Sequence, residues 1–201
     1  MRLHFGPPPE DPDFQPEAQG WHSIREPGPV LVQVIAIPVA LAVFLILGWI
    51  IAGLSGASPY LSILSVEAVL WLIVLIPLHE LLHVFTQPGL GLSRNSIVGL
   101  WLSRAVIYAS YLGTMSRVRF AVCLAMPFVI LSLLPLIGIA LLKAAFANDE
   151  LIKHLALLSL LNGVASSGDL VGLGLILSQV PRSATLQDKG WRTFWKRSEE
   201  W

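Results

Sequence analysis

Apolar residues along the chain are gathered into four long runs that polar segments separate. The runs cover residues 30–54, 61–85, 120–146 and 151–180. Each is long enough for a bilayer core of about 30 Å, which needs roughly 20 helical residues. The pattern therefore predicts an all-α membrane protein with about four transmembrane helices. Pro38 and Pro127 lie inside two of the runs, and membrane helices tolerate such breaks when neighbouring groups satisfy the freed backbone.

The polar segments divide the chain into three parts. Residues 1–28, with three consecutive prolines followed by acids, predict a disordered cytoplasmic tail, and residues 29–180 form the predicted transmembrane domain. Residues 181–201 carry basic residues among aromatic ones at helical spacing, which predicts an amphipathic cytoplasmic helix on anionic lipid. A solvated tail is the alternative for this last segment, because it is short for an isolated helix.

The loop between the second and third runs, residues 91–119, contains the β-prone strings SIVGLWLS and AVIYASYL. These predict a small β-hairpin at the cytoplasmic membrane surface. An interfacial helix remains open, since the alternation of apolar and polar residues is poor. If the hairpin forms, its exposed edge could align a substrate as an added strand.

Composition agrees with a membrane protein and sets its orientation. Hydrophobic residues make up 55% of the chain and charged residues 13%, with a mean hydropathy of +0.71. Lysine and arginine concentrate in the middle loop and the C-terminal tail, so we expect both termini and that loop in the cytoplasm, as in a multi-pass protein of a prokaryotic plasma membrane. The net charge of zero and the scattered bases make a nucleic-acid partner improbable. The single cysteine, Cys123, excludes an internal disulfide and is expected to face lipid.

The second run contains the string HELLH, formed by His79, Glu80 and His83. Residues 63–85 include fifteen Leu, Ile, Val or Phe residues, and each contributes about −0.3 to −0.6 kcal/mol to the free energy of membrane insertion. Their sum exceeds the cost of about +3 kcal/mol for one central carboxylate, so this helix can insert despite Glu80. Histidines four residues apart share a helical face, which is the geometry of a zinc pair, and Glu80 beside them is the expected general base for zinc-activated water. The alternative is that the histidines bond to neighbouring helices and Glu80 pairs with an arginine.

Two histidines leave zinc without a third protein ligand, and catalytic zinc sites usually have three. Asp169 is the candidate, because it is the only acid between Glu150 and Asp188. At 1.5 Å per residue it lies roughly 15 Å from the cytoplasmic end of its run, in the same half of the bilayer as the histidines. A purely structural carboxylate is the alternative. Asn162, seven residues earlier on the same face, could orient a ligand, bind substrate or join helices.

HELLH together with Asn162 and Asp169 resembles the membrane proteins called putative zincin peptidases, which are similar in plan to the site-2 intramembrane metalloproteases. The resemblance covers roughly residues 66–180. It implies that His79, His83 and Asp169 bind zinc, that Glu80 is the base, and that Asn162 helps to position substrate. The chain departs from the site-2 pattern in lacking the prolines of the asparagine segment and in having Leu170 where glycine follows the aspartate.

The sequence thus predicts a zinc-dependent intramembrane endopeptidase whose partners are the lipid bilayer and a membrane-embedded or membrane-proximal protein substrate. Two other functions stay open. A zinc-stabilised scaffold would keep the ligands without needing Glu80. A metal transporter should show polar positions across both leaflets, and the outer half here has almost none. The sequence makes no prediction of oligomeric state.

Overall fold

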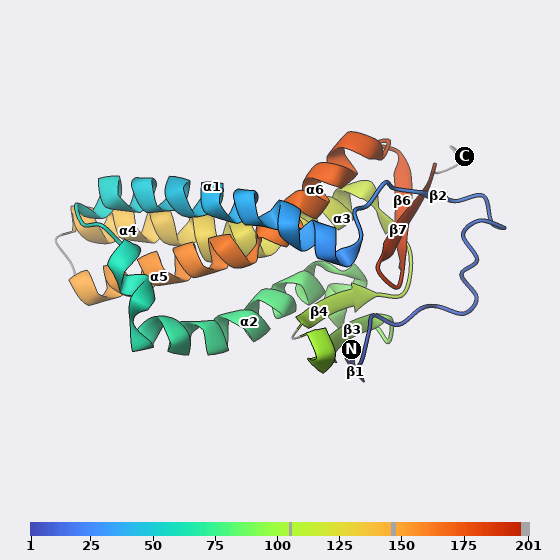
Figure 1. The fold of residues 1–201 in the computed structure, drawn as a ribbon, viewed down its shortest axis with the longest axis horizontal. Coiled ribbons are helices and arrows are strands. Elements are labelled where there is room, and N and C mark those ends of the chain that lie inside the picture. The colour runs from blue at the N-terminus through green and yellow to red at the C-terminus, as the bar shows by residue number, and fades with distance from the viewer. Residues whose placement is uncertain (105, 146–147, 198–201) are drawn as a thin grey trace.

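The computed structural model describes residues 1–104, 106–145 and 148–197, and it places a helical bundle beside two small sheets (Figure 1). The N-terminus and the last strand of the described residues lie at the sheet end of the bundle. The α-helices are α1 (Pro29–Ser55), α2 (Val66–Thr86), α3 (Arg117–Phe128), α4 (Leu134–Ala144), α5 (Asp149–Ala165) and α6 (Ser167–Gln179). Short helical turns are Tyr60–Leu64, Pro88–Gly91 and Leu102–Arg104, with a π-helical turn at Val129–Leu133.

Three helices are long and apolar enough to cross a membrane, by length and composition: Val30–Ser55, Val66–Thr86 and Arg117–Ala144. They correspond to the first three apolar runs of the sequence. The fourth run is broken into α5 and α6, which meet at an angle of 52°. Counted as one bent span, this pair gives a fourth candidate among the described residues.

The bend between α5 and α6 decides where Asp169 lies. The backbone N–H of Ser166 still bonds to the Asn162 carbonyl, but the next helix starts at Ser167 in a new direction. Asp169 consequently occupies the first turn of α6, where the helix dipole favours a carboxylate. The break therefore directs this side chain back toward α2.

The described residues also form seven strands in two sheets, so the predicted all-α fold with one small hairpin was wrong in the amount of β-structure. One sheet has the order β1-β3-β4 and the other β2-β7-β6-β5. The bounds are β1 (Arg2–Phe5), β2 (His22–Ser23), β3 (Ser96–Trp101), β4 (Val106–Tyr111), β5 (Met115–Ser116), β6 (Ala184–Lys189) and β7 (Arg192–Arg197). Strands β3 and β4 pair antiparallel, which confirms the hairpin predicted for the middle loop.

The N-terminal segment differs from the disordered tail that the sequence predicted. Strand β1 pairs parallel with β3, and β2 pairs antiparallel with β7. Between these strands Phe14 is buried against the edges of the Trp21 and Phe194 rings. The N-terminal segment has no apolar run of its own. It is ordered by strand pairing with residues more than ninety positions away and by one aromatic cluster.

The C-terminal segment also differs from its prediction, because it forms the β6–β7 hairpin rather than an amphipathic helix. The pairing of Lys189 with Arg192 leaves a two-residue turn of Gly190 and Trp191, and Gly190 has the positive φ of 60° that such a turn requires. The glycine turn therefore prevails over the helical spacing of the aromatic residues. The predicted aromatic position Trp201 lies outside the described residues.

Two clusters of buried hydrophobic residues hold the helices together. One joins α3 and α6 to the second sheet, and its buried members are Ile24, Met115, Phe120, Ile176, Val180, Ala184 and Leu186. The other joins α1, α4 and α5 through Leu47, Ile51, Ile139, Ile152, Ala156 and Leu160. Helix α2 packs against α3, α5 and β4, and its residues His79, Glu80 and His83 line the cavity that β4 also lines.

Candidate metal centre

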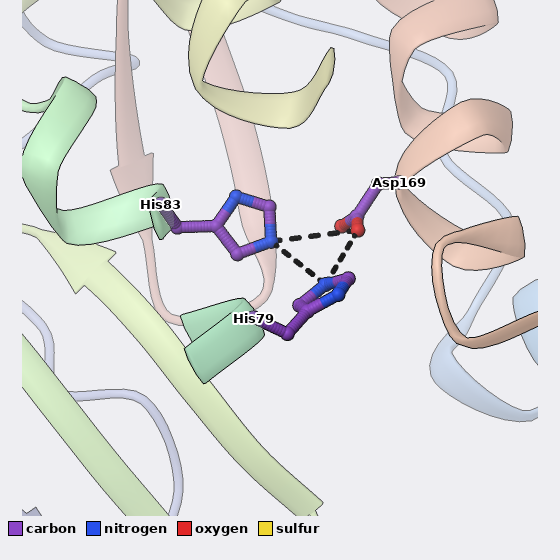
Figure 2. Close-up of side chains that lie close together, drawn as sticks. All are labelled: His79, His83 and Asp169. Atoms are coloured by element: carbon purple, nitrogen blue, oxygen red, sulfur yellow. Dashed lines mark hydrogen bonds and ion pairs between the residues drawn. The ribbon is translucent and has the colours of Figure 1, made fainter. Parts of the chain in front are cut away.

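His79 and His83 of α2 and Asp169 of α6 converge on one point (Figure 2). The Nε2 atom of His79 lies 3.0 Å from Oδ2 of Asp169, and Nε2 of His83 lies 3.4 Å from the same oxygen. The two Nε2 atoms are 3.2 Å apart. Both histidines are only 7% exposed. The structure thus brings together the three side chains that the sequence predicted as metal ligands.

The other nitrogen of each ring is held by an oxygen that only accepts hydrogen bonds. Nδ1 of His83 donates to the Cys123 carbonyl (2.7 Å), and Nδ1 of His79 donates to Oδ1 of Asn162 (2.9 Å). A neutral imidazole carries one N–H, so both Nε2 atoms present lone pairs to the point of convergence. With the Asp169 carboxylate, three acceptors face one another.

Three acceptors at such distances repel one another unless a cation lies between them. Zinc bonds of about 2.0–2.1 Å place tetrahedral ligand atoms about 3.3 Å apart, which matches the separations of 3.0, 3.2 and 3.4 Å. Two imidazoles and one carboxylate are also a typical ligand set for catalytic zinc, which keeps a fourth position open. The residues therefore fit a zinc ion on both geometry and donor chemistry.

The contact between His83 and Cys123 depends on a proline in α3. In a regular helix the Cys123 carbonyl would accept the N–H of residue 127, but Pro127 has none. The freed carbonyl oxygen accepts His83 Nδ1 instead, and Sγ of Cys123 contacts the His83 carbonyl at 3.2 Å. Cys123 is buried at the site, so the prediction that it faces lipid was wrong.

Asn162 lies buried behind His79 and is held from several sides. Its Nδ2 donates to the Pro127 carbonyl (2.9 Å), to Oγ of Ser132 (2.8 Å) and to Oγ of Ser166 (3.2 Å). These bonds fix Oδ1 toward His79, which is how ligand histidines are oriented in zinc sites. The contacts are those of a residue that orients a metal ligand, and substrate positioning by Asn162 stays a prediction.

We expect Asn162→Leu to weaken zinc binding by about 10- to 100-fold, because His79 would lose the acceptor that sets its tautomer and orientation. Titration of the purified apo-protein with zinc measures this. Ser159→Ala is the matched control, since Ser159 is equally buried in α5 but donates only to the Ser132 carbonyl (2.7 Å). Equal zinc affinities in both variants would remove Asn162 from the metal centre.

A cavity of about 540 Å³ adjoins the three ligands, and Glu80 lines it with them. Glu80 is adjacent to His79 in sequence but is not among the converging ligand atoms. Its carboxylate faces the backbone N–H of Ala109 in β4. Glu80 therefore lies beside the three converging side chains and not among them, and its role as a general base stays a prediction.

Strand β4 presents its unpaired edge to this cavity. It is an edge strand, and all six of its residues line the cavity. In an antiparallel pair, every second residue of a strand bonds to its partner strand, and the residues between them point their N–H and C=O groups outward. The hydrogen bond from Leu112 N–H to the Asn95 carbonyl shows which residues of β4 bond to β3. From it, the backbone groups of Ile107, Ala109 and Tyr111 point away from β3. The Ala109 N–H already faces Glu80, and the Tyr111 carbonyl accepts the Gly113 N–H at 3.0 Å. Among the described residues, the N–H and C=O of Ile107, the C=O of Ala109 and the N–H of Tyr111 are therefore available to a further strand.

The second sheet and the segment before α1 contribute two acids to the cavity lining, Glu26 and Asp188. Burial and, to a smaller extent, the nearby charge of Glu26 raise the pKa of Asp188 to about 7, although the hydrogen bond from the Thr193 hydroxyl (2.9 Å) acts to lower it. Burial also raises the pKa of Glu26, which accepts the Thr193 backbone N–H (2.9 Å). Nearby, the Trp101 and Trp191 rings are 5.7 Å apart. This part of the cavity carries less negative charge near neutral pH than its two carboxyl groups suggest.

Comparison with known proteins places the chain in a family. A family with the description "Putative zincin peptidase" matches residues 72–185, a segment that contains all three candidate ligands and Glu80. No curated protein and no solved structure matches the chain. Because the matched segment covers more than half of the 201 residues, the chain belongs to the family described as "Putative zincin peptidase".

Proposed function

We propose that this protein is a zinc-dependent intramembrane endopeptidase. The observation that carries the proposal is the convergence of three acceptor atoms from α2 and α6 beside Glu80 in one cavity. Membership of a zincin peptidase family supports peptide-bond hydrolysis as the reaction. The residues then have separate tasks, in which His79, His83 and Asp169 hold the metal and Glu80 handles protons.

Zinc bound at this site supplies a Lewis acid that acidifies water and polarises a peptide carbonyl. Glu80 accepts one proton from the attacking water, whose oxygen forms a bond to the carbonyl carbon. When the C–N bond breaks, Glu80 passes this proton to the departing nitrogen, and the products are a carboxylic acid and an amine. Asn162 and the Cys123 carbonyl keep both imidazoles in the tautomer that binds metal.

The surface of the helices supports a location in the bilayer. Large apolar side chains are exposed along the length of α1, including Val34, Ile37, Leu41, Leu45 and Trp49. Such a continuous apolar surface suits lipid rather than water. The basic residues of the middle loop favour the cytoplasmic side for the sheets. The metal centre then lies in the inner half of the bilayer, and its cavity extends toward the cytoplasmic surface.

The substrate that this cavity suits is an extended segment of a membrane-embedded or membrane-proximal protein. Peptide bonds in a helix are shielded by side chains and internal hydrogen bonds, so the segment must unwind before hydrolysis. The edge of β4 offers it the N–H and C=O of Ile107, the C=O of Ala109 and the N–H of Tyr111, next to Glu80. Addition of the substrate as a strand would satisfy its backbone and straighten the scissile bond.

Ile107→Pro is expected to lower kcat/KM for a membrane peptide by about tenfold, since it removes one outward N–H but no ladder hydrogen bond. The assay uses a labelled peptide with a Leu/Ala segment of about 20 residues and a flexible Gly/Ser extension, reconstituted in liposomes, with the cleavage site identified by mass spectrometry. Ile107→Val is the control and should cleave like the wild type. Unchanged cleavage by Ile107→Pro would exclude strand addition at β4.

A further inference from the structure

Gln87 is a buried polar residue that the mechanism above does not use. It lies at the C-terminal end of α2 and is 3% exposed. Its Oε1 has no hydrogen-bond partner among the described residues. Gln87 nevertheless lines the cavity that contains the metal ligands and Glu80. A buried amide oxygen without a donor is unfavourable, and native proteins contain few of them, so this one requires an explanation.

The local structure holds Gln87 in place. Its backbone N–H bonds to the Val84 carbonyl at 3.0 Å, and Pro88 follows it directly. The chain then turns at Gly91, where φ is 74° and an added Cβ would come within 2.2 Å of Val84. This close packing leaves no room for the turn to move toward the helix. The amide therefore belongs to the built wall of the cavity, one helical turn beyond His83.

We propose that Gln87 is a substrate-binding residue, whose Oε1 accepts a hydrogen bond from a backbone N–H of the bound peptide. The proposal rests on the proposed peptidase function and adds a specific contact to it. A strand paired with β4 directs alternate N–H groups away from β4. Those groups would otherwise be buried without an acceptor in the apolar part of the cavity, which Met115, Phe120 and Leu124 line.

The position along the peptide follows from helix and strand geometry. Gln87 lies seven residues after Glu80, which corresponds to about 10 Å along α2. An extended peptide advances about 3.3 Å per residue, so about three of its residues cover this distance. Gln87 is thus expected to bind the N–H of the residue two or three positions from the scissile bond. Because the contact is to the backbone, it adds affinity without selecting a side chain.

Binding to a catalytically inactive protein tests the proposal without relying on turnover. The zinc-loaded Glu80→Gln protein, in liposomes, is titrated with the fluorescent Leu/Ala peptide described above. Addition of Gln87→Leu should raise the Kd about tenfold, since one hydrogen bond is lost. It should not lower the thermal unfolding midpoint, because leucine replaces an unsatisfied amide. Thr86→Val is the matched control, as Thr86 is the preceding residue, bonds only to helix carbonyls and does not line the cavity.

Ester substitution identifies the atom involved. Peptides in which one backbone N–H at a time is replaced by oxygen should lose about tenfold in affinity at a position two or three residues from the scissile bond. The loss of affinity caused by the ester should be absent when the peptides bind to the Gln87→Leu protein. It should remain when they bind to the Thr86→Val protein. An unchanged Kd in Gln87→Leu, or an equal ester effect in both backgrounds, would overturn the role of Gln87.

The outcomes separate this proposal from the peptidase function. If the wild type cleaves the peptide and Glu80→Gln does not, the peptidase function stands whatever the result for Gln87→Leu. If the wild type fails to cleave but Gln87→Leu still weakens binding, the cavity binds peptide without hydrolysing it. If Glu80→Gln shows no saturable peptide binding, the role of Gln87 is overturned.

Discussion

Replacing Glu80 by glutamine is expected to reduce peptide hydrolysis by about 10²- to 10⁴-fold, the usual contribution of general acid–base catalysis. The amide has the same shape as the carboxylate but cannot accept the proton of the attacking water. Bound zinc should remain, because Glu80 is not one of the three converging ligands. Initial rates on the liposomal peptide, together with the zinc content of the same sample, measure both quantities.

Glu67→Gln is the matched control for this experiment. Glu67 lies in the first turn of the same helix, pairs with Lys153 at 2.6 Å and does not line the cavity. Its replacement should leave the rate within about twofold of the wild type, since a partly exposed ion pair contributes little. Wild-type cleavage by Glu80→Gln would exclude Glu80 as the base. Full biological function of that variant in cells, with zinc bound, would favour the zinc-stabilised scaffold.

Loss of either histidine should have the largest effect on the metal itself. We expect His79→Ala and His83→Ala each to weaken zinc binding by more than about 100-fold, because removal of a ligand exceeds the loss of its hydrogen-bonded support. Hydrolysis should fall to background in both variants. Zinc titration of the apo-proteins and the peptide assay measure these effects.

His154→Ala separates a metal effect from a general effect of removing a hydrogen-bonded imidazole. His154 lies in α5, where its Nδ1 accepts the indole N–H of Trp71 at 3.2 Å, and it does not line the cavity. This variant should bind zinc and cleave peptide like the wild type. Zinc affinity that falls equally in all three histidine variants would point to lost folding rather than a lost ligand.

The three residues that converge on the candidate metal site could be predicted because the chemistry of each is visible in the sequence. Histidines four residues apart must share a helical face, so His79 and His83 required no tertiary information. Asp169 could be found because an acid inside an apolar run is rare and has to be explained. The predicted hairpin was likewise local, since β3 and β4 are neighbours in the chain.

Of the two groups that hold the histidine rings, Asn162 was a candidate from the sequence, but the Cys123 carbonyl was not predictable in the same way. The Cys123 carbonyl acts through its backbone, which every residue shares, and only the loss of the Pro127 N–H makes it available. Pro127 was visible in the sequence as a helix break, but nothing local indicates which side chain takes the freed carbonyl. Gln87 was equally hidden, because a polar residue after a helix is usually a solvated cap.

The terminal segments were mispredicted because their order comes from distant partners. Strand β1 pairs with β3, and β2 pairs with β7 near the other end of the chain. A composition rich in proline and acids predicts disorder only when no such partner exists. In the last segment, the spacing of the aromatic residues predicts a helix, whereas Gly190 favours a tight turn between two strands. The structure has the turn.

The central claim is that α2 and α6 hold one metal ion jointly, and the zinc content of Asp169→Ala tests it most directly. Elemental analysis should find about one zinc per chain in the wild type and in Asp188→Ala, whose carboxylate lines the cavity away from the ligand set. Asp169→Ala should retain less than about a tenth of this amount after dialysis against a weak chelator. Stoichiometric zinc in Asp169→Ala under the same conditions would contradict the account, because the metal would then be bound without α6.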